Sequence, residues 1–293
     1  MQSISSNARP QPATAPAGLY TSIFRDVESG AVPLPSLPHL ALQIRSVLSD
    51  QNSGFETVSR IIQTDPGVAS YLLKMANSPA FGSRHKATDL RAAIGRMGTG
   101  SLVNVVTSYC LRQMFRSRSP ALRAVLREVW VGSARLGATC AVVAREVTRQ
   151  NPDRALLSGL LANIGALPLI RALADRVDLT ASPQIVESAV SRYGRQVGVM
   201  MLSKWGFEEW LLNAVRQHGV WHYTSEERDF AELVIVCDLL LRKSQQADFV
   251  KPSLESVPAI SNFAAKWPDV EWTPQLLTDL ESSVKETEAE LNS

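Results

Sequence analysis

Residues 34–81 constrain the fold most, because apolar side chains recur there at the spacing of three short amphipathic helices. The third of these helices has the clearest start, with Asp65 suited to the N-cap and Pro66 to the first helical position. Its apolar face carries Val68, Leu72 and Met75. Helices of about ten residues are not stable alone in water, so we expect the three to pack on one another.

The rest of the chain also favours helices. No stretch of useful length alternates apolar and polar residues as a half-buried strand would. Thr88 or Asp89 can cap a helix that Gly98 closes, and another helix starts near Ser101. The uncharged run 155–170 is predicted to be a buried helix, because it is too short and too broken to span a membrane. The predicted fold class is all-α.

Composition limits the kind of protein. A chain of 293 residues, 45% of them hydrophobic, can form one large domain or two small ones. A net charge of +2 creates no overall field towards nucleic acid or an acidic membrane. Three cysteines, far apart and without zinc spacing, indicate buried thiols in a reducing compartment. No apolar signal core occupies the first twenty residues, so we expect a cytoplasmic protein.

Changes in composition predict four segments. Residues 1–17, rich in Ser, Pro, Ala and Gln, are expected to form a disordered arm. A charged Ser-Arg-Pro loop near residue 118 is the predicted boundary between an N-terminal helical lobe, 18–118, and a second helical lobe, 119–242. Residues 243–293 are predicted to be a loop-rich extension that ends in an acidic, largely solvated helix.

Three sequence motifs carry a family resemblance. They are the leading LPSLP, the central QTDPGVASYLLKMANS and the following DLRAAIGRMG. Together they resemble the bacterial HDOD signalling domain, a degenerate relative of the HD-type metal phosphohydrolases, from about residue 34 to about residue 218. The resemblance implies a multi-helix HDOD-type fold with an N-terminal helical lobe and a C-terminal HD-like lobe.

The resemblance also locates an ancestral metal site. HD phosphohydrolases bind metal through a His on one helix, an adjacent His-Asp pair on the next and a later Asp. The corresponding segments here read WVGS and LLANIGA, which place Gly132, Ala162 and Asn163 at three ligand positions. Gly and Ala cannot ligate a metal, and neutral Asn is a poor substitute for a bridging carboxylate. We therefore expect no metal, no cofactor and no catalysis.

A remnant of the ancestral cleft is predicted at Asn163, Gln196 and His218. His218 is similar to a His that the family often keeps at the end of this helix. The alternative is that His218 only closes a helix C-terminus, where positive charge is favoured and Gly219 ends the turn. A divergent phosphohydrolase would use a non-standard metal site around the same three residues.

Arginines form the second candidate site. Residues 112–154 hold nine Arg against three acids, and Arg112 with Arg116, and Arg123 with Arg127, have the i,i+4 spacing that places a pair on one helix face. Such pairs can bind phosphate bidentately, so they could bind a nucleotide, nucleic acid or an acidic partner. The alternative is that they solvate helix faces and pair with the acidic tail of the chain. The predicted partner or anion surface comprises Arg84, His85, Arg112, Arg116, Arg123 and Arg127.

A helix-turn-helix unit over residues 58–77 is an alternative interpretation of the opening stretch. A recognition helix presents Arg, Lys, Asn or Gln near its N-terminus. The predicted second helix opens on Asp65-Pro66-Gly67 and carries Lys74 as its only cation. Binding to nucleic acid is therefore not expected.

The resemblance implies a non-catalytic regulatory protein of bacterial signal transduction that acts by protein–protein contact. It implies partners among two-component or cyclic-di-GMP enzymes and outputs in motility, biofilm or stress. No GGDEF, EAL or receiver segment is present, so we expect the input to come from a separate partner. Candidate contact surfaces are the loop 78–85 and the arginine stripe over residues 112–127. The alternative function is a nucleotide or other anion-binding module that uses this stripe.

Overall fold

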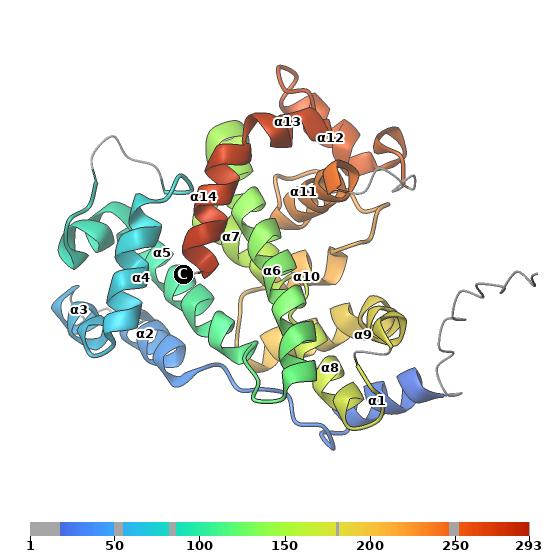
Figure 1. The fold of residues 1–293 in the computed structure, drawn as a ribbon. Helices are drawn as coiled ribbons and strands as arrows, with labels where there is room; N and C mark the ends of the chain where they lie inside the picture. The colour runs from blue at the N-terminus through green and yellow to red at the C-terminus, as the bar shows by residue number, and fades with distance from the viewer. Residues whose placement is uncertain (1–17, 50–54, 82–85, 180–181, 246–251, 293) are drawn as a thin grey trace, which may run out of the picture.

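A computed structural model describes residues 18–49, 55–81, 86–179, 182–245 and 252–292. These residues form helices joined by turns, without a strand among them (Figure 1). The all-α fold class is thereby confirmed. The predicted arm at 1–17 and the candidate residues Arg84 and His85 lie outside the described residues.

The helices follow the order expected from the apolar periodicity. The first part of the chain forms α1 (Leu19–Glu28), α2 (His39–Ser49), α3 (Phe55–Gln63), α4 (Pro66–Asn77) and α5 (Leu90–Met114). The central part forms α6 (Pro120–Val143), a π-helical turn (Ala144–Thr148), α7 (Pro152–Leu161), α8 (Ala166–Ala174), α9 (Pro183–Lys204) and α10 (Glu209–Gln217). The last part forms α11 (Phe230–Gln245), a 3-10 turn (Leu254–Ser256), α12 (Pro258–Lys266), α13 (Pro274–Asp279) and α14 (Glu281–Asn292).

Side-chain caps set two of the helix starts. Asp65 Oδ1 accepts hydrogen bonds from the backbone N–H groups of Gly67 at 2.9 Å and Val68 at 3.2 Å, as the sequence predicted. Asp89 caps α5 through the N–H of Ala92 at 2.7 Å. Gly98 interrupts α5 with φ 77° and ψ 162°, a conformation that glycine adopts without steric cost. The two helices predicted on either side of Gly98 are thus two parts of one kinked element.

Helices α6 and α7 pack closely at the centre of the molecule (Figure 1). Glycines make this approach possible, because a Cβ on Gly159 would lie 2.7 Å from the Cα atom of Gly137. Asn151 starts α7 by accepting a hydrogen bond from the N–H of Arg154 at 3.0 Å, and Pro152 takes the first helical position.

The uncharged run 155–170 is not one helix, which corrects the prediction. It belongs to α7 and α8, and a turn at residues 162–165 separates them. The turn lies against α9, where a Cβ on Gly165 would be 2.0 Å from the carbonyl oxygen of Gly194. By length and composition alone, Pro152–Ala174 reaches the size of a membrane span, but 89% of its most apolar window is buried inside the fold.

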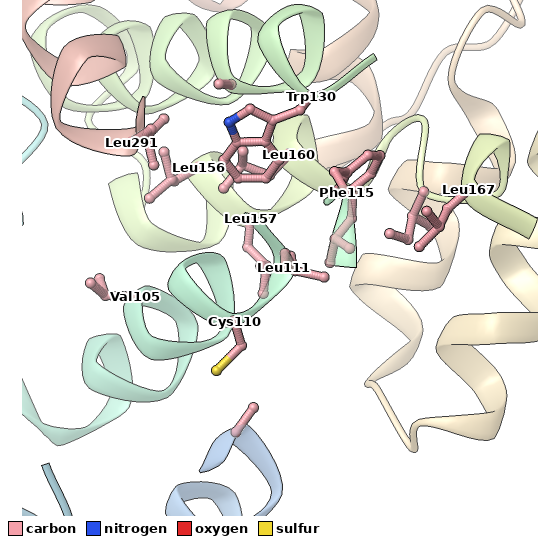
Figure 2. Close-up of a cluster of buried hydrophobic side chains, with 14 of the residues drawn as sticks. Val105, Cys110, Leu111, Phe115, Trp130, Leu156, Leu157, Leu160, Leu167 and Leu291 are labelled. Carbon is pink, nitrogen blue, oxygen red and sulfur yellow. The ribbon is translucent and has the colours of Figure 1, made fainter. Parts of the chain in front are cut away.

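One hydrophobic cluster connects most of the molecule. It includes buried side chains from α1 through α10 and from α14. Figure 2 shows part of it, with Leu111 of α5, Trp130 of α6, Leu157 of α7 and Leu291 of α14 converging. A second cluster packs α11, α12 and α13 against α6 and α7.

Within the predicted loop-rich extension, the described residues 252–292 are more helical than expected. The nine-residue helix α12 is tied to α11, because Lys266 Nζ lies 3.1 Å from Oε2 of the fully buried Glu232. The acidic helix α14 has five exposed residues, but it buries Val284, Thr287 and Leu291. It packs along α6 and reaches α4 and α5 (Figure 1).

Candidate functional site

The three substituted ligand positions lie on α6 and in the α7–α8 turn. Gly132 is exposed on α6, and a Cβ there would meet nothing within 4 Å. Ala162 is buried at the C-terminal end of α7, with 2% of its surface exposed. Asn163 follows in the turn and is half-buried. Of these three side chains, only that of Asn163 has an atom that could contact a metal.

His218 is buried at the C-terminal end of α10, and its partner is an acid that sequence analysis missed. His218 Nε2 donates a hydrogen bond to Oδ2 of Asp238 on α11 at 3.1 Å. The guanidinium of Arg242, one turn further along α11, lies 3.0 Å from both oxygens of the same carboxylate. His218, Asp238 and the partly exposed Arg242 therefore form a connected polar group between α10 and α11.

The carboxylate of Asp238 is ionised despite its burial. Burial by itself raises the pKa of a carboxyl group, but the charges and hydrogen bonds of His218 and Arg242 outweigh this effect. The net result is a pKa of Asp238 below its ordinary value. Both carboxylate oxygens are thus engaged by cationic or hydrogen-bonding side chains.

These residues do not fit the metal that an HD-type site would hold. A divalent metal needs several His, Asp or Glu ligands arranged around one point. Within the described ranges, no group of three or more His, Cys, Asp or Glu side chains is arranged in this way. His218 and Asp238 are neighbours, and Arg242 contacts the same carboxylate.

The predicted cleft remnant is not a connected group in the described part of the chain. Gln196 is exposed on α9, and no described hydrogen bond joins it to Asn163 or His218. His218 does occupy the C-cap of α10 with Gly219 behind it at φ 74°, as the structural alternative predicted. Asp238 stands out in the sequence only as one of two acids, with Glu232, within the apolar run 231–241, which was a weak signal for its role.

The arginines form a more concentrated arrangement. Arg112 lies in the last turn of α5, Arg116 follows in the turn between α5 and α6, and Arg123 and Arg127 come from the first turns of α6. All four line one cavity of about 580 Å³. Its remaining lining residues are Phe115, Ser117, Trp130, Val131 and Asn292. Arg123 and Arg127 share a helix as predicted, but Arg112 and Arg116 do not, because α5 ends at Met114. The convergence of the four side chains depends on the turn between α5 and α6.

That turn is held by one of the arginines. Arg123 donates from Nε to the carbonyl oxygen of Ser117 at 3.0 Å and from Nη2 to that of Arg118 at 2.9 Å. At the opposite wall, Trp130 Nε1 donates to Oδ1 of Asn292 at 2.8 Å, which joins α6 to α14. The cavity is therefore built by three helices and the α5–α6 turn.

The all-α architecture agrees with the multi-helix fold that the sequence motifs predicted. The profile of the HDOD domain matches residues 34–220, more than half of the chain. The chain belongs to the HDOD domain family.

Solved structures share this fold at low sequence identity. A Shewanella amazonensis SB2B protein, provisionally named as a metal-dependent phosphohydrolase, is 20% identical with a TM-score of 0.80, covering 93% of this chain and 98% of that one. A Marinobacter aquaeolei VT8 protein, provisionally named as a signal transduction protein, is 17% identical with a TM-score of 0.57, covering 93% of this chain and 65% of that one. At such identities the comparison establishes the fold alone.

A similar sequence also occurs in an uncharacterized protein of Treponema pallidum (strain Nichols), which is 23% identical over 224 residues. The match covers 71% of this chain and 42% of that protein. This chain therefore corresponds to less than half of the length of its relative.

Proposed function

We propose that this protein is a non-catalytic HDOD regulator of bacterial signal transduction that acts through protein–protein contacts. Membership of the HDOD family supports the regulatory role. The similarity in fold to a provisionally named signal transduction protein agrees with it.

The residues at the substituted ligand positions carry the non-catalytic part of the proposal, and the engaged carboxylate of Asp238 agrees with it. An HD-type hydrolase needs a carboxylate that is free to bind metal, which in turn activates water. Here the carboxylate contacts Arg242 through both oxygens and His218 through one. Gly132 and Ala162 add no donor atom where further ligands would be needed.

The proposed setting is the cytoplasm, and the proposed partners are other signalling proteins, with two-component and cyclic-di-GMP enzymes as the first to test. The buried state of the apolar stretch Pro152–Ala174 agrees with this setting. A partner would act by favouring one arrangement of the helices over another, which requires different affinities for the two arrangements.

Metal content and hydrolysis test the proposal together. Purified protein would be analysed by inductively coupled plasma mass spectrometry and assayed with bis(p-nitrophenyl) phosphate in the presence of manganese or iron. We expect substoichiometric metal and no hydrolysis above the background of the buffer. Stoichiometric metal that is lost in Asp238→Asn, together with hydrolysis, would overturn the non-catalytic assignment.

Capture of partners tests the second half of the proposal. We expect the native chain to retain signalling proteins from a lysate of its own cells, identified by mass spectrometry. Arg123→Glu combined with Arg127→Glu should reduce this capture if the arginine stripe contributes to the contact. Unchanged capture would remove the stripe from the partner surface.

A further inference from the structure

The arginine cavity concentrates positive charge without a matching acid. Its lining contains four arginines and no Asp or Glu. In the part of the chain that the structure describes, the guanidinium groups of Arg112, Arg116 and Arg127 make no hydrogen bond or ion pair. None of the described ion pairs joins them to the acidic helix α14. Pairing with the acidic tail, the structural alternative, thus does not account for this cluster.

Like charges that converge in a concave site attract anions. Low-dielectric walls focus the field and raise the local concentration of a ligand of opposite charge. A neighbouring cavity of about 200 Å³ shares Arg112 and Arg116 and adds Lys74 and the hydroxyl-bearing Tyr71 and Tyr109. The positive region therefore extends from α6 across α5 to α4.

The cavity also has an apolar wall, which distinguishes it from a flat basic surface. The rings of Phe115 and Trp130 lie with centroids 5.6 Å apart at an angle of 47°, and Figure 2 shows the two side chains next to each other. Val131 beside them is 40% exposed. A volume of about 580 Å³ is in the range of sites that enclose one small molecule.

We propose that this cavity binds a phosphorylated small molecule that carries a ring, of the nucleotide class. Guanidinium groups bind phosphate oxygens bidentately and also stack on planar rings. The cluster can therefore neutralise the phosphates while Phe115, Trp130 and Val131 contact the apolar part of the ligand. A nucleic acid would instead need an open surface along which successive phosphates could be contacted.

The position of the cavity makes the ligand an input to the proposed regulatory role. It lies at the α5–α6 turn, near the predicted lobe boundary, and Asn292 of α14 forms part of its wall. A ligand in contact with Trp130 would change the surroundings of the Trp130–Asn292 hydrogen bond and hence the docking of α14. The inference adds a small-molecule input to the proposed regulator, but it does not depend on the absence of catalysis.

Isothermal titration of the full chain tests the site with GTP, ATP, pyrophosphate and guanosine as probes. We expect saturable binding of at least one nucleotide, weaker binding of pyrophosphate, which lacks the ring, and weakest binding of guanosine, which lacks the phosphates. Affinity for the nucleotide should fall as the salt concentration rises from about 0.05 M to about 0.2 M, because screening weakens exposed charge–charge attraction. A lack of saturable heat with both nucleotides would refute the proposal, whatever the metal and hydrolysis assays give.

Charge reversal locates the binding. Arg116→Glu combined with Arg127→Glu should weaken nucleotide binding by about 30-fold or more, since two charge-assisted contacts become repulsive. Arg25→Glu combined with Arg60→Glu changes the net charge equally at exposed positions outside the cavity and should change affinity by less than about threefold. Equal losses of nucleotide affinity in both variants would show an effect of net charge alone and would overturn the assignment of binding to the cavity.

Two further measurements complete the test. Arg116→Gln combined with Arg127→Gln removes the two positive charges without adding carboxylates that would repel the phosphates of the ligand. Circular dichroism verifies that each variant is folded. In the second measurement, a single-stranded oligonucleotide competes with GTP for the protein. If the oligonucleotide, at a concentration counted in phosphates, binds more tightly than GTP and displaces it, the cavity region is assigned to nucleic acid instead.

Discussion

At the scale of single residues, Asp238 is a buried carboxylate held by two side-chain partners, His218 and Arg242. Its side chain is 10% exposed and bridges the end of α10 to α11 through His218. An acid in this environment is stable only because two partners compensate for the lost hydration.

Removal of this carboxylate charge should destabilise the fold. We expect Asp238→Asn to lower the free energy of unfolding at pH 7 by about 2–4 kcal/mol, because His218 and Arg242 lose a buried anionic partner. Urea unfolding followed by circular dichroism measures the change. Glu226→Gln, at an exposed position, is the matched control. Equal unfolding free energies for the two variants would contradict the role assigned to Asp238.

The stability difference between the native chain and Asp238→Asn should depend on pH. The pKa of Asp238 is lower in the folded chain than its ordinary value. The stability that it contributes is therefore present above the ordinary Asp range, about pH 4, and is lost as the pH falls through the lower folded pKa. The difference in stability between the native chain and Asp238→Asn should accordingly shrink as the pH falls below about 4.

Cysteine reactivity provides a second residue-scale prediction. Cys110, Cys140 and Cys237 are free thiols and all are buried. Burial raises the pKa of Cys110 to about 11, and burial together with the neighbouring Cys237 raises the pKa of Cys140. Only the thiolate reacts readily, so we expect these cysteines to be protected from Ellman's reagent at pH 8 in the native chain. All three should react after unfolding in guanidinium chloride, and rapid reaction of the native chain would contradict the described packing.

Helix caps, which depend on neighbouring residues, could be predicted from the sequence, whereas contacts between residues far apart in the sequence could not. The caps at Asp65 and at His218-Gly219 depend on neighbours within a few positions, and both were predicted from the sequence. The partnership of His218 with Asp238 spans twenty residues and depends on how α10 packs against α11. No spacing rule in a single sequence contains that information.

At the scale of elements, glycine contacts decide where helices lie. The uncharged run 155–170 has the composition of one buried helix, yet Gly165 brings its backbone against α9 and the helix ends before it. Similarly, the polar segment after α11 was predicted to be mostly loop. It contains α12 because Asn262 and Lys266 satisfy the buried Glu232, at 2.6 Å and 3.1 Å respectively. Both outcomes depend on tertiary partners that the local sequence does not specify.

The contact between α6 and α7 can be tested with two glycines of opposite surroundings. A Cβ on Gly159 would lie 2.7 Å from both the Cα and the N of Gly137, and helix backbones cannot move aside as a side chain can. We expect Gly159→Ala to destabilise the protein by about 3 kcal/mol through overpacking.

Gly132→Ala is the control, because it lies in α6 with open space around it. It should stabilise the protein by about 0.5–1 kcal/mol, since Ala loses less backbone entropy than Gly in a helix. Thermal unfolding by circular dichroism compares the two variants. The α6–α7 approach would be in doubt if Gly159→Ala proved as stable as the native chain.

At the scale of the whole molecule, the predicted lobes share a core. The boundary predicted near residue 118 falls in the turn between α5 and α6. Buried side chains on both sides of that turn nevertheless belong to one cluster, and Leu291 of α14 joins it from the other end of the described chain. The sequence supplied the family and the helices, but whether lobes share a core depends on how their faces pack, which apolar periodicity does not reveal.

This shared core predicts one unfolding transition for the whole helical body. All six tryptophans lie after residue 118, so their fluorescence reports on the second lobe and the C-terminal segment, whereas circular dichroism reports on every helix. If the lobes unfold together, the two signals should give the same midpoint in urea. Leu111→Ala, in α5 where the side chain is 1% exposed, should shift both midpoints equally by removing about 2–4 kcal/mol of stability.

The contrary result is a circular-dichroism transition that Leu111→Ala shifts while the tryptophan transition stays in place. That result would show that the first lobe folds independently. In that case a ligand at the α5–α6 turn would act between two separate bodies, and its effect on the tryptophan transition alone would measure the coupling between them.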